Sequence, residues 1–134
     1  LTGGILGTST YTDFNVFMLA RTNTVTASFA FLENMAAGGR LSATSPFSDN
    51  LVYWDAGGTG ANQRLTAAWG GNTATNYIWG LTASTTATAS GARQDIYRNG
   101  RRIANDNTMA SSTGNNSVFN LGSSGGGNYY NGDF

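Results

Sequence analysis

Residues 93–107 read RQDIYRNGRRIANDN, and this stretch decides the fold. Two runs that favour β-structure, Asp95–Arg98 and Arg101–Ala104, meet across the two residues Asn99-Gly100. Asn and Gly tolerate the positive φ of a type I′ turn, and the pair is the strongest short-range signal of a hairpin. The sequence therefore predicts an antiparallel hairpin with its tip at Asn99-Gly100.

Outward from this hairpin, the chain is a series of short runs of β-favouring residues. They include Val118–Gly122 downstream and Leu51–Asp55, Leu65–Trp69 and Tyr77–Thr82 upstream. The run Phe14–Ala20 is nearly continuous apolar, which is typical of a strand buried on both faces. About eight to ten such strands, separated by Gly, Asn and Ser turns, predict an all-β fold, an antiparallel sandwich of jelly-roll type.

The length of 134 residues fits one domain, 1–134, with no linker or internal repeat. A chain of this size buries roughly two-thirds of its unfolded surface, so a single sandwich core can form without disulfides. The formal net charge is zero and charged residues make up only 10% of the chain. Such a surface forms hydrogen bonds without being ionic, as in many extracellular and virion β-proteins.

The chain lacks the residue types that several classes of catalytic and binding site require. The chain has no Cys, no His and no Lys, so Ser/His/Asp and Cys/His catalysis, thiolate zinc sites, Schiff bases and lysine-bearing phosphate loops are excluded. Glu33 is the single glutamate, and a glycosidase of this fold needs two on one strand. The aspartates fall at expected turns or strand ends, where Asp bonds its own backbone. We expect a protein that is not an enzyme.

Nucleic acid and membrane insertion are not expected either. All seven cations are arginines, and only Arg98, Arg101 and Arg102 cluster, which is far from the basic stripe that phosphate binding needs. No run approaches the roughly 20 apolar residues of a membrane helix.

A recurring order of short motifs points to a family. The hairpin is followed by Phe119-Asn120-Leu121-Gly122 and then by Tyr130-Asn131-Gly132-Asp133 before a hydrophobic residue, and upstream stand Ser48–Asp55, Ala68–Gly71 and Tyr77–Trp79. From about Asp13 to Phe134 the chain resembles laminin-G-like domains of the concanavalin-A-like lectin and glucanase superfamily, especially those of phage and bacterial surface proteins. In such domains the last motif leads into a full closing strand. The resemblance therefore implies that these 134 residues lack the closing strand, so that they are either a fragment of a longer chain or leave an edge that something else, such as a neighbouring chain, fills.

The resemblance implies a non-catalytic structural or adhesion module, such as a phage decoration or fibre domain at the virion surface. Its partners would be other copies or structural subunits, with surface glycans as a further ligand. The alternative is a lectin-like carbohydrate-binding module of a secreted or cell-surface bacterial protein. Both readings place the protein on a virion or outside the cell.

Aromatic and amide side chains supply the candidate glycan site. A sugar stacks its apolar face on an exposed aromatic ring, and Tyr129 and Tyr130 follow a glycine-rich loop that also brings Asn128. Trp54 is a further candidate, because the alternation of β-structure leaves open whether it or its neighbours face inward. Trp69 and Trp79 lie within periodic strands and are expected in the core.

Two other sets of residues have alternative readings. Arg98, Arg101 and Arg102 at the hairpin tip are candidates for an interface with carboxylates, or else a solvated tip that discourages edge pairing. The chain predicts no obligatory cofactor. Calcium is the one ion with candidate ligands, the carboxylates of Asp49, Asp55 and Asp106, although capped turns explain the same residues.

Overall fold

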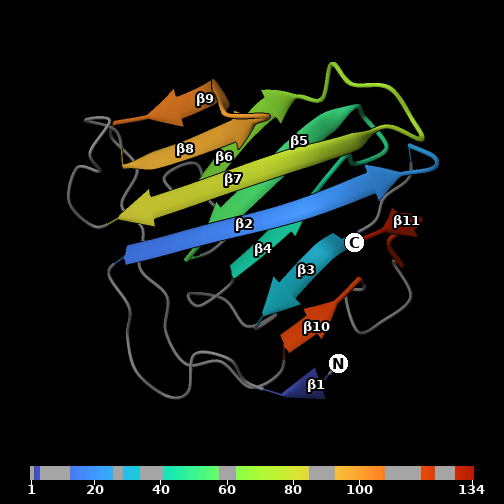
Figure 1. Cartoon of the computed structure of the whole chain (residues 1–134). Helices are drawn as coiled ribbons and strands as arrows, with labels where there is room; N and C mark the ends of the chain where they lie inside the picture. Colours follow the sequence, from blue (N-terminus) through green and yellow to red (C-terminus); the bar gives the residue numbers. More distant parts are fainter. Residues whose placement is uncertain are drawn as a thin grey trace.

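The computed structural model contains two antiparallel sheets and describes residues 2–3, 13–25, 29–33, 41–57, 63–84, 93–107, 119–122 and 129–134 (Figure 1). One sheet has six strands. In spatial order these are β1 (Thr2–Gly3), β10 (Phe119–Leu121), β3 (Phe29–Glu33), β4 (Leu41–Thr44), β5 (Leu51–Ala56) and β6 (Arg64–Ala68). The other sheet has five strands, β11 (Gly132–Asp133), β2 (Asp13–Thr22), β7 (Asn76–Ser84), β8 (Gln94–Arg98) and β9 (Arg101–Asp106). All described pairings are antiparallel.

The two sheets pack face to face around one apolar core. Trp54 and Val52 of β5 meet Trp79 and Leu81 of β7 and Ile96 of β8, all of them fully buried. Aromatic side chains dominate such cores because each removes a large apolar area from water. The prediction of an all-β antiparallel sandwich is therefore confirmed, while the finer assignment to a jelly roll stays a prediction.

Two hydrogen bonds join the sheets across this core. The indole Nε1 of Trp54 donates to the backbone carbonyl of Thr82 at 2.9 Å, and the hydroxyl of Thr22 donates to the carbonyl of Ser45 at 2.7 Å. Each bond satisfies a polar group that would be costly to bury alone. These two bonds hold the five-stranded sheet against the six-stranded sheet, with one of its faces turned inward.

The predicted hairpin is confirmed. Strands β8 and β9 are joined by Asn99 and Gly100, whose φ values are 50° and 77°. The tip is also fastened to the neighbouring strand, because the Asn99 amide donates to the carbonyl of Ile78 and the Asn99 side-chain oxygen accepts from the Ile78 amide. The hairpin thus supplies the two strands at one edge of the five-stranded sheet.

One prediction about burial is wrong. Strand β2 was expected to be buried on both faces, but Phe17 is 76% exposed and Leu19 is 56% exposed. Val16, Met18 and Ala20 take the alternate positions and pack against the core. In an antiparallel sandwich each sheet turns only one face inward, so the other half of this apolar strand lies on the surface.

Candidate functional site

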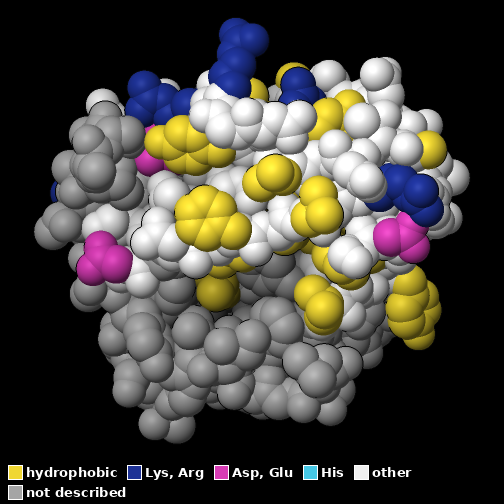
Figure 2. Space-filling model, viewed as in Figure 1, with side chains coloured by type: hydrophobic (Ala, Val, Ile, Leu, Met, Phe, Trp, Pro, Cys, Tyr) yellow, Lys and Arg dark blue, Asp and Glu magenta, His cyan; other side chains and the backbone are white. Residues whose placement is uncertain are grey.

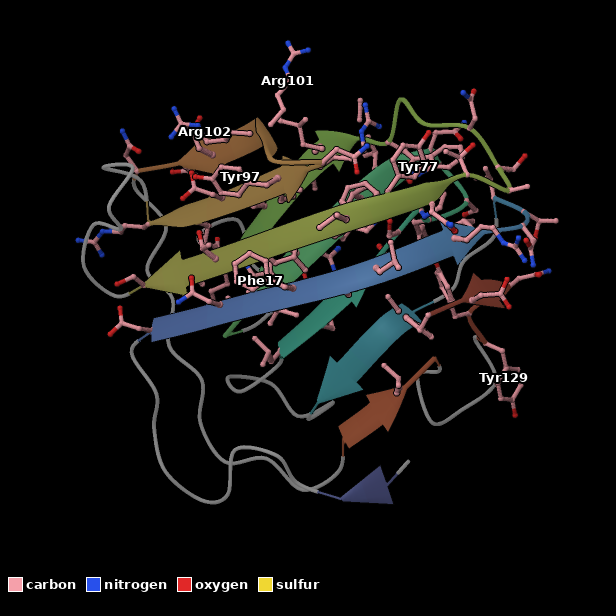
Figure 3. All side chains as sticks on the ribbon, in the orientation of Figure 1. Phe17, Tyr77, Tyr97, Arg101, Arg102 and Tyr129 are labelled. Atoms are coloured by element: carbon pink, nitrogen blue, oxygen red, sulfur yellow. The ribbon has the colours of Figure 1, made fainter. Side chains whose placement is uncertain are left out.

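The outer face of the five-stranded sheet carries a row of side chains set by the strand register. Phe17 of β2 lies opposite Gly80 of β7, and Gly80 lies opposite Tyr97 of β8. One step along the strands, Leu19 of β2 is opposite Ile78 of β7. We call these five residues the apolar face. Figure 3 shows Phe17 on β2 and Tyr97 on β8, on the same side of the sheet with β7 between them.

Three of these side chains, Phe17, Leu19 and Ile78, are exposed to a degree that is unusual for their types. Ile78 is 56% exposed, like Leu19 beside it, and Phe17 is exposed further still. Figure 2 shows hydrophobic side chains gathered across this face, with arginines along its upper rim. Single exposed hydrophobic residues are common, but a contiguous group is typical of a surface that binds something.

A hollow of about 320 Å³ opens in the apolar face. Phe17, Ile78, Tyr97 and two glycines, Gly80 and Gly100, line it together with Thr82. Gly80 keeps the floor low, because a Cβ there would stand 3.4 Å from both the Phe17 ring and the Tyr97 Cβ. The missing side chain lets the Phe17 ring lie down across the sheet.

Few hydrogen-bonding groups enter this hollow. The Thr82 hydroxyl donates to the carboxylate of Asp95 at 3.0 Å, so it is already engaged. Asp95 is itself buried and has Arg102 Nη1 at 3.4 Å from its other oxygen. The hollow therefore suits an apolar group better than a polar one.

The three arginines of the hairpin tip have different roles. Arg98 turns back over the Tyr77 ring, with 5.3 Å from its guanidinium carbon to the ring centre, and donates to the carbonyl of Trp69. Arg102 faces Asp95, and Arg101 projects from the rim into solvent (Figure 3). Of the predicted interface candidates, Arg101 lies exposed on the rim, and Arg102 is partly exposed there but pairs with Asp95, whereas Arg98 fastens the loop after β6 to the hairpin.

The predicted glycan residues do not form one site. Trp54 is a wrong candidate, because its ring is 0% exposed in the core and its Nε1 is bonded across the sandwich. Tyr129 is 72% exposed, but Figure 3 shows it away from the apolar face. Tyr130 stacks on Phe134 at 4.7 Å between ring centres, and its hydroxyl shares a hydrogen bond with Thr22. Asn128 lies outside the described residues.

Burial also affects the acidity of one of these tyrosines. It raises the pKa of the Tyr130 hydroxyl above its ordinary value of 10.0, and the hydrogen bond with Thr22 partly opposes that rise. The Tyr130 ring stacks on Phe134, and the Tyr130 hydroxyl is bonded to Thr22. Tyr129 is therefore the freer of the two for stacking on a ligand.

The carboxylates proposed as calcium ligands are engaged by protein donors. Asp55 is 1% exposed, and Arg64 grips both its oxygens, with 2.8 Å from Nη2 to Oδ2, while Ser42 donates to the same carboxylate at 3.0 Å. A guanidinium in this position competes with any cation, so Asp55 is a wrong candidate. Among the residues that the structure describes, no group of three or more Asp, Glu, His or Cys is placed to hold a metal ion.

Asp49 and Asp106 bond to other groups. Asp49 accepts from the Tyr53 hydroxyl and, at 3.0 Å, from the Leu51 amide, as a capped turn does. The hydrogen bond from Tyr53 lowers the pKa of the Asp49 carboxyl below its ordinary value of 3.8 and raises the pKa of Tyr53 above 10.0. Asp106 ends β9 in the other sheet, where its carbonyl accepts from the Arg93 amide.

The apolar face is not predicted by the sequence pattern. Phe17 and Leu19 were assigned to the core, and Ile78 and Gly80 were read as parts of a strand and nothing more. One signal was present: β2 is apolar at successive positions, which is more than a strand with a single buried face requires. A glycine inside β7 also marks a place where another group comes close to the backbone.

Comparison with known proteins adds no assignment. The chain matches no protein-family model, no curated protein and no solved structure. Within the described parts of the chain, no helix has the length and apolar character to cross a membrane.

Proposed function

We propose that this protein is a non-catalytic contact module whose binding surface is the apolar face. The observation that carries the proposal is the exposure of Phe17, Leu19 and Ile78 together on two paired strands. Leaving these side chains in water forgoes on the order of 25 cal/mol for each Å² of apolar area that a partner would cover. A partner that covers them would recover that free energy.

The chemistry of the chain supports contact rather than catalysis. The two buried carboxylates for which the structure gives ion pairs, Asp55 and Asp95, each face an arginine and belong to different sheets. They do not face each other as a glycosidase pair does. Together with the absence of His, Cys and Lys from the sequence, this favours a structural or adhesion role, of the kind that the family resemblance implies on a virion or outside the cell.

A matched pair of variants tests this proposal. Phe17→Ser removes an exposed ring from the apolar face, and Tyr129→Ser removes an equally exposed ring elsewhere. Self-association by sedimentation velocity and binding to a glycan array are measured for both variants and for the unchanged protein. We expect at least one of these activities in the unchanged protein, lost in Phe17→Ser and kept in Tyr129→Ser. Identical behaviour of the unchanged protein and Phe17→Ser in both assays would show that the apolar face binds nothing.

Glycan binding at Tyr129 is the second candidate function. Its ring is 72% exposed, and an exposed aromatic platform is what the apolar face of a sugar stacks on. If this candidate is correct, the glycan array signal disappears in Tyr129→Ser and persists in Phe17→Ser.

A further inference from the structure

Strand β2 has one edge that is paired along only a short part of its length. On one side it pairs with β7 from Asp13 to Arg21 without a break in register. On the other side β11 pairs with Arg21 and Thr22 alone, and Figure 1 shows β11 beside the C-terminal end of β2. Among the strands that the structure describes, none lies beside the rest of this edge. We call this part, Asp13–Ala20, the β2 edge.

The hydrogen bonds around β2 show which of its backbone groups face this edge. The Thr22 carbonyl accepts from the Ala74 amide just before β7 at 2.7 Å, and the Asn23 amide donates to the Asn131 carbonyl just before β11 at 2.8 Å. In an antiparallel sheet, successive residues direct their N–H and C=O groups to opposite neighbours. The even-numbered residues of β2 therefore bond to β7. The backbone groups that point to the β2 edge include those of Asn15, Phe17 and Leu19.

The bonds between β7 and β8 lead to the same assignment. The Asn99 amide donates to the Ile78 carbonyl at 2.7 Å, so the backbone groups of Ile78 face β8. Those of its neighbour Trp79 then face β2, where Met18 lies opposite. Met18 is an even-numbered residue, as the bonds at the end of β2 require.

The β2 edge lacks the features by which proteins protect an exposed strand edge. Protected edges are short, charged, interrupted by proline or bent by a β-bulge. Residues 14–20 of β2 read FNVFMLA, with no charge and no proline, and the register with β7 has no shift. The opposite edge of the same sheet, β9, carries Arg101, Arg102 and Asp106 and has a register shift against β8. This contrast within one sheet favours β2 as an edge that accepts a further strand.

An added strand would also cover apolar side chains that β2 leaves incompletely buried. On the inner side, Val16 and Met18 are only partly buried, whereas Leu81 and Trp79 opposite them in β7 are 0% and 1% exposed. On the outer side, Phe17 is exposed. A strand beside β2 would lie next to both sets and remove apolar area from water.

We propose that the β2 edge binds an extended segment of another protein, which joins the five-stranded sheet as a strand antiparallel to β2. The edge offers N–H and C=O groups at every second residue, and an extended polypeptide presents matching groups at the same spacing. The direction follows from β11, which lies in the same line and is antiparallel to β2. The segment carries apolar side chains on both faces, beside Met18 and Phe17. This inference goes beyond the proposed function, because it uses the backbone of β2 rather than the apolar face.

An NMR titration of the isotope-labelled protein tests the edge. The probe is a capped seven-residue peptide of alternating Thr and Val, added up to about 5 mM so that weak pairing is detected. In the free protein, the amides of Asn15, Phe17 and Leu19 should exchange rapidly with solvent. The peptide should shift their resonances and slow their exchange by at least about 10-fold. Unchanged shifts and exchange of these three amides at the highest peptide concentration overturn the proposal.

A matched pair of substitutions at Asn15 tests the backbone contact. Asn15→Pro removes an N–H that faces the β2 edge and makes no bond to β7, so the fold should be kept. Asn15→Thr keeps that N–H and changes only an exposed side chain. We expect Asn15→Pro to weaken peptide binding by at least about 10-fold and Asn15→Thr to leave it unchanged. Equal binding by the two variants, with matching circular dichroism, would refute strand addition.

A modified probe gives the same test without a variant. The peptide N-methylated at every residue has no backbone donors, so it should leave the three amides of the β2 edge unaffected. Binding as tight as that of the unmethylated peptide would contradict backbone pairing.

Two further results would assign the β2 edge to a different occupant and overturn the proposal. Slow exchange of the three amides in dilute protein without peptide would show that the chain itself covers the edge. Slow exchange that appears only as the protein concentration rises would identify a second copy. The proposed function fails separately: Phe17→Ser alters the apolar face and should still bind the peptide, whereas Asn15→Pro keeps the apolar face and should not.

Discussion

Replacing Gly100 by Val should destabilise the protein through the backbone alone. Gly100 occupies the hairpin tip with φ of 77°, and a Cβ built there meets no atom within 4 Å. No steric clash therefore contributes to the cost. The positive φ costs an L-residue about 1–2 kcal/mol, and a β-branched side chain resists it most.

An opposing effect reduces this cost. Any residue with a side chain has less freedom in the unfolded chain than glycine, which favours the folded state by about 0.4–1 kcal/mol. The net expectation is a loss of about 1 kcal/mol for Gly100→Val. In a chain of this size that loss corresponds to a fall of about 4 °C in melting temperature.

Urea unfolding followed by tryptophan fluorescence measures the effect, with Gly100→Asn as the control. Asparagine tolerates positive φ better than other side-chain residues, so Gly100→Asn should lie close to the unchanged protein. Both variants should keep the same m value, because the surface exposed on unfolding does not change. If Gly100→Val is as stable as Gly100→Asn, the positive φ does not limit stability and the argument from backbone strain is wrong.

Three further changes test other parts of the structure. Trp54→Phe removes the hydrogen bond to the buried Thr82 carbonyl and leaves a small cavity, and urea unfolding should show a loss of about 2–3 kcal/mol. Arg64→Met removes the guanidinium from the buried Asp55 carboxylate and should cost about 3 kcal/mol by the same measurement, because the uncompensated charge stays buried; a stability equal to that of the unchanged protein would contradict this. The raised pKa of Tyr130 keeps its hydroxyl protonated in the folded state when the unfolded chain has begun to ionise, so stability is fully present below pH 10 and falls as pH rises through the folded pKa. The chain has no lysine to titrate in this range, and Tyr130→Phe should show a shallower alkaline loss in melting temperature.

The parts of the fold that could be predicted are those with local causes. Asn99-Gly100 determines a tight turn by its own backbone preferences, and the structure has the predicted hairpin there. Trp69 directly follows β6 and Trp79 lies in β7, and both are buried as expected. For the turn, the decisive interactions lie within a few residues along the chain; for the two tryptophans, the strand pattern predicted burial although the core that covers them comes from distant residues.

The candidate site could not be predicted in the same way, because it depends on which sheet face is covered. An apolar strand has the same appearance whether a second layer of the domain or a partner from outside covers its far side. Phe17 and Leu19 were therefore expected in the core, and tertiary packing places them on the surface. Trp54 shows the converse: the alternation of the strand did not decide which way it points, and the packing of β5 against the other sheet turns it inward.

Folding stability and association depend on opposite faces of the same strands. In β2, Val16, Met18 and Ala20 pack on the core, whereas Phe17 and Leu19 point outward. A substitution of an outward-facing residue removes little buried area, so it should change the free energy of unfolding by less than about 0.5 kcal/mol. The outer residues are thus free to vary without loss of the fold, and the requirement for folding does not explain why they are apolar. That their hydrophobic character falls on one face of the sheet, around a glycine, is what points to contact with another molecule.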